Sequence, residues 1–229
     1  MRIPDYQKAK TAATQVLRKQ NFNVVDIDVR KFTYSKDIVF IETWKYCDCI
    51  GISDWELRRI IDDGCTIHDT KTDICTVIYN DRCDERYSRG RVQYTLAHEV
   101  GHIYLDHGAE DDRTDEVEAN AFASQLLMPE YTILRMYNDY GYVNQGAISA
   151  IFGVSKSAAQ NRLDSLKRRK GIYYNQDDID VYELQRERIA MFYESRNDIA
   201  YYRLLYTRFA DEITKFENRL KVTAANMYL

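Results

Sequence analysis

Long apolar segments are missing from this sequence. None of its 229 residues falls in an uninterrupted apolar run of about 18 or more, the length that a membrane-spanning helix needs. Residues 1–20 also lack the apolar stretch of a secretory signal peptide. We therefore expect a cytoplasmic protein without a membrane partner.

Paired cysteines are missing as well. The five cysteines are odd in number, and no two of them have the CxxC spacing that is typical of metal and redox motifs. In a reducing compartment this pattern predicts neither a disulfide framework nor a second metal site. We expect reduced and mostly buried thiols at Cys47, Cys49, Cys65, Cys75 and Cys83.

An excess of positive charge is likewise absent, because the formal net charge is −4 and the sequence pI is about 5.7. The molecule as a whole should have no general attraction for nucleic acid, so any such contact must rest on a local basic patch. Hydrophobic residues make up 45% and charged residues 30%, which is typical of a globular protein.

The first third of the chain has the patterns of one helix followed by strands. Apolar residues recur at helical spacing over residues 5–20, beginning with Tyr6, and we expect this amphipathic helix to lie against a sheet. Runs rich in β-branched and aromatic residues at 37–44 and 73–80 predict strands. They indicate a small mixed or antiparallel sheet.

Helical patterns dominate from Val92 onward. The helix that starts there should be closed by Gly108. After an acidic loop, the next helix should begin at Glu116 and stop before Pro129, which can open another short helix that Gly141 ends.

The remaining residues predict more helices. Residues 144–168 have the pattern of two short helices around Gly153, with Ser155 as the N-cap of the second, which resembles a helix-turn-helix. No glycine or proline follows Gly171, and apolar residues alternate by four and three over 202–220. A long C-terminal helix is expected, which either packs within the chain or contacts a partner protein.

The sequence HEVGH at 98–102 carries the clearest chemistry. Residues four apart lie on one face of a helix, so His98 and His102 can direct two imidazoles at one metal ion. Glu99 lies beside that face, where a carboxylate can act as general base without binding the metal. This pattern predicts a catalytic zinc site.

A catalytic zinc ion needs a third protein ligand. His107 follows His102 by five residues, which on a helix turns its side chain about 140° away, so we expect it to face elsewhere. It would then lie near the helix end either at the surface or in the shell of residues around the metal ligands. Glu116 can bind the metal, with Asn120 stacked four residues later to orient a ligand. Glu118 is rotated about 200° from Glu116 and should point to solvent.

Three stretches of the chain also carry a family resemblance. They are VIYND at 77–81, RVQYTLAHEVGHIYLDH at 91–107 and EVEANAFASQLLMP at 116–129. These stretches resemble the ImmA/IrrE-type zinc metallopeptidases of bacterial mobile elements and stress responses. In that family the first glutamate of the last signature is a metal ligand, which supports Glu116 over Glu118. The resemblance covers roughly residues 30–170 and is looser beyond Pro129.

The resemblance implies a zinc endopeptidase of the gluzincin type that cleaves a helix-turn-helix transcriptional repressor, and so acts as an anti-repressor. Attack on the peptide carbonyl would be assisted by Glu99, while the oxyanion donor stays open, with Tyr94 and Tyr104 available. The repressor and the scissile bond are not identified by the sequence.

These observations together predict an α+β fold in which a small sheet packs on the HExxH helix. We expect a zincin-like metallopeptidase domain at 1–140, a helix-turn-helix-like segment at 141–172 and a helical extension at 173–229.

Two other functions compete with the peptidase. A DNA-binding regulator with a structural metal site is favoured by Lys156, Arg162 and the basic run at 167–170, which lie on or near a possible recognition helix. A toxin-antitoxin-type partner protein would use the C-terminal helix. The acidic remainder of the chain speaks against the DNA-binding regulator, and a helix-turn-helix shape also serves as plain packing. Glu99 speaks against the partner protein, because a structural site has no use for an acid between its histidines.

Overall fold

The structure is a computed structural model, and it describes residues 2–20, 27–57, 61, 63–80, 89–108, 113–168 and 173–194. The chain divides into two compact units, Met1–Arg186 and Glu187–Leu229. In the second unit only residues 187–194 are described, so the fold below is that of the first. The apolar stripe predicted over 202–220 lies outside the described residues.

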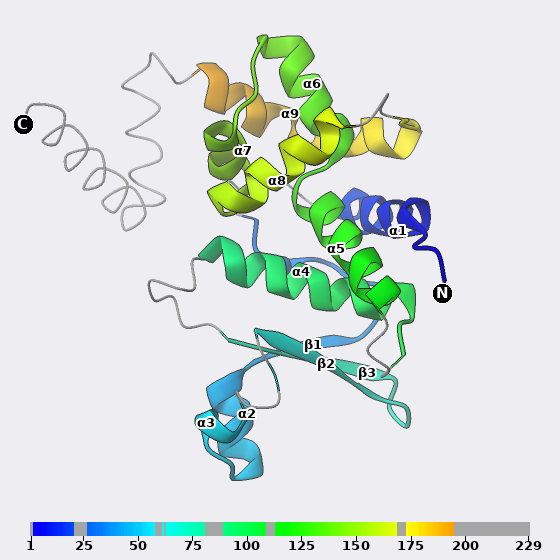
Figure 1. The fold of residues 1–229 in the computed structure, drawn as a ribbon, viewed down its shortest axis with the longest axis vertical. Coiled ribbons are helices and arrows are strands. Elements are labelled where there is room, and N and C mark those ends of the chain that lie inside the picture. Colours follow the sequence, from blue (N-terminus) through cyan, green and yellow to red (C-terminus); the bar gives the residue numbers. More distant parts are fainter. Residues whose placement is uncertain are drawn as a thin grey trace, which may run out of the picture. The chain divides into compact units, whose positions relative to one another are not determined.

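A mixed three-stranded sheet lies at one side of the first unit (Figure 1). Its strands are β1 (Ile38–Glu42), β2 (Gly64–Asp69) and β3 (Ile74–Tyr79), in the order β1-β3-β2. β1 runs parallel to β3 and β2 antiparallel to it. The predicted strands at 37–44 and 73–80 are confirmed, except that Thr43 and Trp44 belong to the helix that follows; β2 was not predicted.

The central strand β3 is mostly apolar, as expected for a strand with both faces covered. Val77 pairs with Thr66 of β2, on the face that meets helix α4 (Arg89–Leu105). Ile78 points to the opposite face and packs with Cys47 of α2 (Thr43–Ile50) and Leu57 of α3 (Asp54–Leu57). Together with the short 3-10 helix η1 (Val29–Lys31), these elements fix the sheet under α4.

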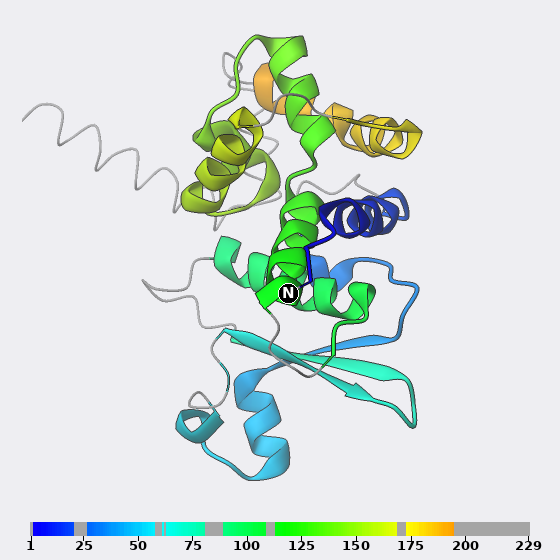
Figure 2. The same cartoon turned by 45° about the vertical axis from the view of Figure 1, so that its right-hand side comes forward.

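Three further helices build layers on the sheet, as Figures 1 and 2 show. α4 lies against the sheet, α5 (Arg113–Leu127) crosses α4, and α1 (Tyr6–Arg18) packs on α5. The helix predicted over 5–20 is thus confirmed, but the expectation that it lies against the sheet is wrong. Its buried face is made of small and aliphatic residues such as Ala9 and Ala13, and Tyr6 is exposed. Small side chains suit the close approach of two helices.

The remaining helices begin and end as their capping residues predict. Pro129 precedes α6 (Glu130–Tyr140), which Gly141 ends in the left-handed region at φ +77°. α7 (Gln145–Phe152) ends at Gly153, also left-handed, and Ser155 caps α8 (Lys156–Lys167) by accepting from the Ala158 amide. Both helices of the predicted helix-turn-helix-like segment are therefore present. The last described helix is α9 (Gln176–Glu194).

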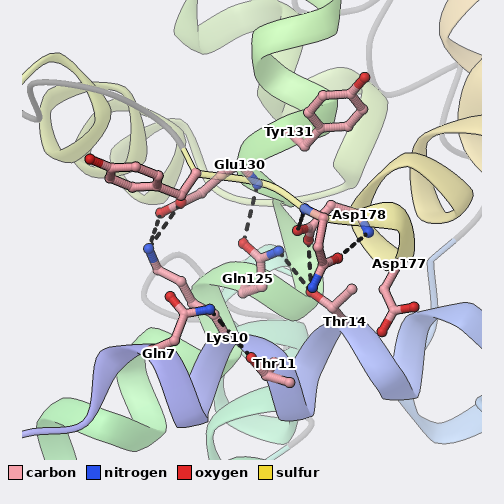
Figure 3. Close-up of a pocket in the computed structure, with 11 residues that line it drawn as sticks. Gln7, Lys10, Thr11, Thr14, Gln125, Glu130, Tyr131, Asp177 and Asp178 are labelled. Carbon is pink, nitrogen blue, oxygen red and sulfur yellow. Dashed lines mark hydrogen bonds and ion pairs between the residues drawn. The ribbon is translucent and has the colours of Figure 1, made fainter.

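A buried polar junction joins α8 to the other helices. The Arg162 guanidinium donates to the Met128 carbonyl at 2.9 Å and to Gln125 Oε1 at 2.8 Å, and pairs with Glu130 at 3.3 Å. Glu130 also pairs with Lys10 of α1 at 2.8 Å, and Figure 3 shows Gln125, Glu130 and Lys10 converging at this point. The helix-turn-helix-like segment is thus pinned to α1, α5 and α6. Its predicted boundaries at residues 140 and 172 stay predictions.

Across the described ranges, no helix combines the length and the apolar character needed to cross a membrane.

Candidate metal centre

Helix α4 brings the two histidines of the HEVGH sequence together. His98 and His102 are one turn apart, and their Nε2 atoms lie 3.0 Å from each other. Both rings are partly buried, and burial lowers the pKa of His102 to about 4 and also lowers that of His98. The imidazoles are therefore neutral at neutral pH, which is the form that binds a metal.

Helix α5 supplies the carboxylate. Glu116 Oε2 lies 3.3 Å from His98 Nε2, and Glu116 Oε1 lies 3.2 Å from His102 Nε2. The helix begins at Arg113, one turn before the predicted start at Glu116. Glu116 consequently stands in the first turn of α5, with its backbone fixed by the helix.

A close crossing of α4 and α5 sets these distances. A Cβ atom added at Gly101 would lie only 3.2 Å from the Ala119 Cα and carbonyl oxygen and from Phe122 Cβ. Glycine at 101 therefore lets the two backbones approach as larger residues would not. Gly101 lies between His98 and His102 in α4, and Ala119 is three residues after Glu116 in α5, so the crossing holds the two histidines close to Glu116.

The three donor atoms fit a metal ion. Four ligands held about 2.0–2.1 Å from a tetrahedral zinc ion lie about 3.3 Å from one another. The two imidazole nitrogens lie 3.0 Å apart, and each lies 3.2 or 3.3 Å from a different oxygen of Glu116, which is close to that spacing. Two neutral imidazoles with one carboxylate are donors that zinc accepts, so these residues could hold a zinc ion at the wall of the cleft.

Glu99 lies next to this triad but outside it. The residue is 8% exposed, and its Oε2 accepts a hydrogen bond of 2.8 Å from Thr66 Oγ1 on β2. Burial raises the pKa of Glu99 to about 7, against the opposing effect of the Thr66 hydroxyl. The carboxyl group can therefore exchange a proton near neutral pH.

Thr66 was missed in the sequence because β2 was missed. The strand GCTIHD begins at Gly64, where an added Cβ would lie 2.7 Å from Thr95 Cγ2 of α4. The glycine allows β2 to pass close to the helix, and the alternation of the strand then directs Thr66 at Glu99. A glycine before an alternating stretch was the signal available.

An open cleft runs past these groups, between β2 and the exposed side of α4. It has a volume of about 1210 Å³ and is lined from both sides of the metal-ligand triad. Residues that line it include Thr66, His68, Tyr94, Thr95, His102 and Asp106. The cleft gives the triad access to a substrate.

Asn120 and Tyr94 lie together beside His98. The Asn120 amide donates to the Glu116 carbonyl at 2.8 Å and its side chain also hydrogen-bonds His98. The Tyr94 hydroxyl lies 3.2 Å from Asn120 Oδ1. Tyr104, by contrast, directs its hydroxyl to the Ser35 amide at 3.0 Å and does not line the cleft. Of the two tyrosines, only Tyr94 lies where a substrate would bind.

His107 lies where helical geometry did not predict it. α4 ends at Leu105 and Asp106 adopts a left-handed conformation with φ +55°, so Gly108 is not the cap. The turn brings His107 Nδ1 to 3.0 Å from His102 Nδ1. The expectation that His107 faces away is therefore wrong, because it assumed that the helix continued.

Glu118 is also placed differently from the prediction. It is 2% exposed instead of pointing to solvent, and it contacts His107 and Arg2. The segment before α1 covers that face of α5, which a rotation angle alone does not reveal.

Comparison with protein families gives one match. Residues 82–164 match the family model Peptidase_M78, described as the IrrE N-terminal-like domain. The resemblance to ImmA/IrrE peptidases is thereby confirmed for this segment, which contains α4, α5 and the triad. A comparison with curated proteins finds no match.

Proposed function

Because residues 82–164 match the IrrE N-terminal-like domain of a peptidase family, we propose that this chain is a cytoplasmic zinc-dependent endopeptidase of the gluzincin type. His98, His102 and Glu116 would hold the metal, and Glu99 would move the proton. The observation that carries this proposal is the convergence of two imidazole nitrogens and the Glu116 carboxylate at separations of 3.0 to 3.3 Å, beside the buried carboxyl group of Glu99.

Each residue of the proposed site would have a distinct role in peptide hydrolysis. Zinc, when bound, would supply a Lewis acid for the peptide carbonyl and lower the pKa of water. The Thr66 hydroxyl holds Glu99 Oε2, which leaves Oε1 to take a proton from the attacking water and return it to the amide nitrogen that leaves. Asn120 fixes His98 from behind, as a metal-binding histidine requires.

Tyr94 is our proposed donor to the developing oxyanion. Its hydroxyl lies in the cleft wall and is held by Asn120 and by Ser124 Oγ at 3.3 Å. A positioned O–H group of this kind can stabilise negative charge on a carbonyl oxygen.

A protein is the proposed substrate. The cleft of about 1210 Å³ exceeds the roughly 300–1,000 Å³ of typical small-molecule pockets. On the basis of the family resemblance, we propose that the substrate is a helix-turn-helix transcriptional repressor of a phage, a mobile element or a stress response. Cleavage of that repressor would make this chain an anti-repressor.

DNA binding is the weaker candidate. Arg162, which the sequence placed on a possible recognition helix, is 5% exposed and engaged in the polar junction. Lys156, Lys167 and Arg168 are exposed on α8 and at its C-terminal end, and residues 169–170 of the basic run lie outside the described residues. Three exposed basic side chains in the described part of this segment offer few phosphate contacts, so we expect weak binding to DNA without the steep salt dependence of a specific regulator.

The decisive test is cleavage of the repressor encoded beside this gene. The wild-type chain, Glu99→Gln and the control Glu183→Gln, which changes an exposed carboxylate on α9, are each co-expressed with that repressor. We expect a metal-dependent cleavage product with the wild type and the control. Glu99→Gln should bind zinc stoichiometrically and give no product.

Two results would contradict the proposal in different ways. Equal cleavage by the wild type and Glu99→Gln would contradict the role of Glu99. A wild-type chain that binds zinc but leaves the repressor intact would contradict the substrate.

A further inference from the structure

A second cluster of ionisable side chains lies behind His102, on the side away from Glu116. His107 Nδ1 is 3.0 Å from His102 Nδ1, and His107 Nε2 is 3.1 Å from Glu118 Oε2 and 3.6 Å from an Asp115 oxygen. The side chains of His107 and Glu118 are only 2% and 3% exposed. A buried chain of hydrogen bonds thus starts at a proposed metal ligand.

The direction of these hydrogen bonds follows from the geometry of His102. Its Nε2 faces His98 and Glu116, so with a metal bound there the ring proton sits on Nδ1. That N–H can donate to His107 Nδ1, which must then be unprotonated. The proton of His107 is left on Nε2, where it donates to Glu118.

The segment before α1 anchors the far end of this chain. The Arg2 guanidinium pairs with Asp115 at 2.5 Å and with Glu118 at 2.8 Å. The Asp5 amide donates to the second Glu118 oxygen at 2.6 Å, and Thr114 Oγ1 donates to the Arg2 carbonyl at 3.1 Å. Glu118 is therefore held at both oxygens and presents a fixed acceptor to His107.

We propose that His107 is a positioning residue for the metal ligand His102, and that Arg2 supports it through Glu118. We call His107, Glu118 and Arg2 the relay. It fixes the orientation and tautomer of the His102 ring, so Arg2, in the segment that precedes α1, influences zinc affinity although it does not contact His102 itself. This inference rests on the proposed function, because it requires metal at His98, His102 and Glu116.

The same three side chains could instead be a second metal site, since their donor atoms lie within 4.8 Å of one another. The position of Arg2 speaks against it. Its guanidinium pairs with both carboxylates, so a metal ion placed between them would face a fixed positive charge. The Glu118 carboxylate is therefore placed to accept a hydrogen bond from His107.

Zinc affinity and stoichiometry test the relay. Apoprotein is titrated with zinc against a chromogenic chelator for the wild type, His107→Ala, His107→Gln, Arg2→Ala and Arg18→Ala. Arg18 of α1 is the matched control, because its guanidinium also pairs with two carboxylates, Asp177 at 2.7 Å and Asp180 at 3.1 Å. Neither of these ion pairs involves a residue of the proposed metal centre. Cobalt absorption spectra report the ligand geometry independently of activity.

We expect one zinc per wild-type chain and an affinity roughly 10–100-fold lower in His107→Ala, the usual effect of removing an outer hydrogen-bond partner. His107→Gln should recover part of the loss because an amide both accepts and donates. Arg2→Ala should weaken binding by about 3–10-fold, since it lies further out. Arg18→Ala should bind zinc with the affinity of the wild type. Among the soluble variants that bind one metal ion per chain, only His107→Ala should change the cobalt absorption spectrum.

Several outcomes overturn the relay. Wild-type affinity in His107→Ala does so, as does a second zinc equivalent that disappears in that variant. Equal losses in Arg2→Ala and Arg18→Ala would show a general effect of surface charge; this pair also carries the test if His107→Ala does not fold. A wild type that binds no zinc contradicts the proposed function instead, which keeps the two failures apart.

Discussion

The two ends of helix α5 each carry a cluster of polar side chains, and the two clusters differ in how their charges are matched. At its beginning, the Glu116 carboxylate meets two neutral histidines. Near its end, Gln125 meets Arg162, which reaches the Glu130 carboxylate already paired with Lys10. We call the first cluster incomplete, because its carboxylate meets neutral groups, and the second complete, because its carboxylate meets cationic side chains.

This difference separates binding sites from structural ones. A buried polar group costs free energy unless it is paired, so two neutral imidazoles brought together with one carboxylate are donors that a metal ion can satisfy. A cluster in which each charged group is paired with an opposite charge holds helices together and offers no unpaired group for a ligand to bind. Helices α4 and α5 show the first case, and the junction at α8 shows the second.

The largest effect should come from removing a ligand of the incomplete cluster. Glu116→Ala leaves two histidines, so zinc affinity should fall by far more than the roughly 10–100-fold that loss of an outer partner costs. The unfolding free energy of the apoprotein should change little, because no other charge is left unpaired. Zinc titration and urea unfolding of the apoprotein measure both. Wild-type zinc affinity in this variant would remove Glu116 from the site.

The complete cluster should respond in the opposite way. Arg162→Met removes the side-chain donor of the Met128 carbonyl, one of the two donors to Gln125 Oε1 and one partner of the buried Glu130 carboxylate, so the unfolding free energy should fall by about 3 kcal/mol, with zinc stoichiometry unchanged. Lys167→Met is the control, since this exposed lysine is 4.0 Å from Asp164 and should contribute less than about 0.5 kcal/mol. Similar losses in the two variants would show that the junction is not structural.

The crossing of α4 and α5 should link stability to metal binding. Gly101→Val drives a side chain into the backbone of α5, so we expect about 1–3 kcal/mol of destabilisation together with weaker zinc binding. Gly108→Val is the matched control for unfolding, because a Cβ there meets no atom within 4 Å. If zinc affinity survives in Gly101→Val, the crossing does not set the ligand distances.

The smallest effect should be at the edge of the incomplete cluster. Thr66→Val removes one hydrogen bond from Glu99, which is worth about 0.5–1.5 kcal/mol and so should slow repressor cleavage about 2–10-fold. Zinc affinity should stay the same, and Thr66→Ser should restore the rate because it keeps the hydroxyl. A change in zinc affinity would place Thr66 among the groups that hold the metal.

The elements that the sequence predicted best are those with local signals. Pro129, Gly141, Gly153 and Ser155 lie at helix boundaries whose chemistry is contained in a few neighbouring residues. His98 and His102 belong to the same class, since one turn of helix is enough to bring them together. For such features the period of the helix is sufficient.

The features that the sequence missed depend on where another segment lies. Glu118 is buried because residues before α1 cover it, and Arg162 because α8 packs on the start of α6. His107 faces His102 because the helix ends at Leu105 and Asp106 then adopts a left-handed conformation. The sequence alone favours Gly108 over Asp106 as the left-handed residue that ends the helix. Rotation angles hold only while a helix continues, and they do not say what lies opposite.

The division of the ligands between two helices has a consequence for the lifetime of the protein in the cell. Two donors come from α4 and one from α5, so an ion bound to all three acts as a crosslink that the unfolded chain cannot form. By mass action, free zinc at about 100 times its dissociation constant would add about 2.7 kcal/mol to the unfolding free energy. When zinc is scarce, the apoprotein would open more often and be degraded sooner. The supply of the metal would then set how much of the protein is present, in addition to whether it is active.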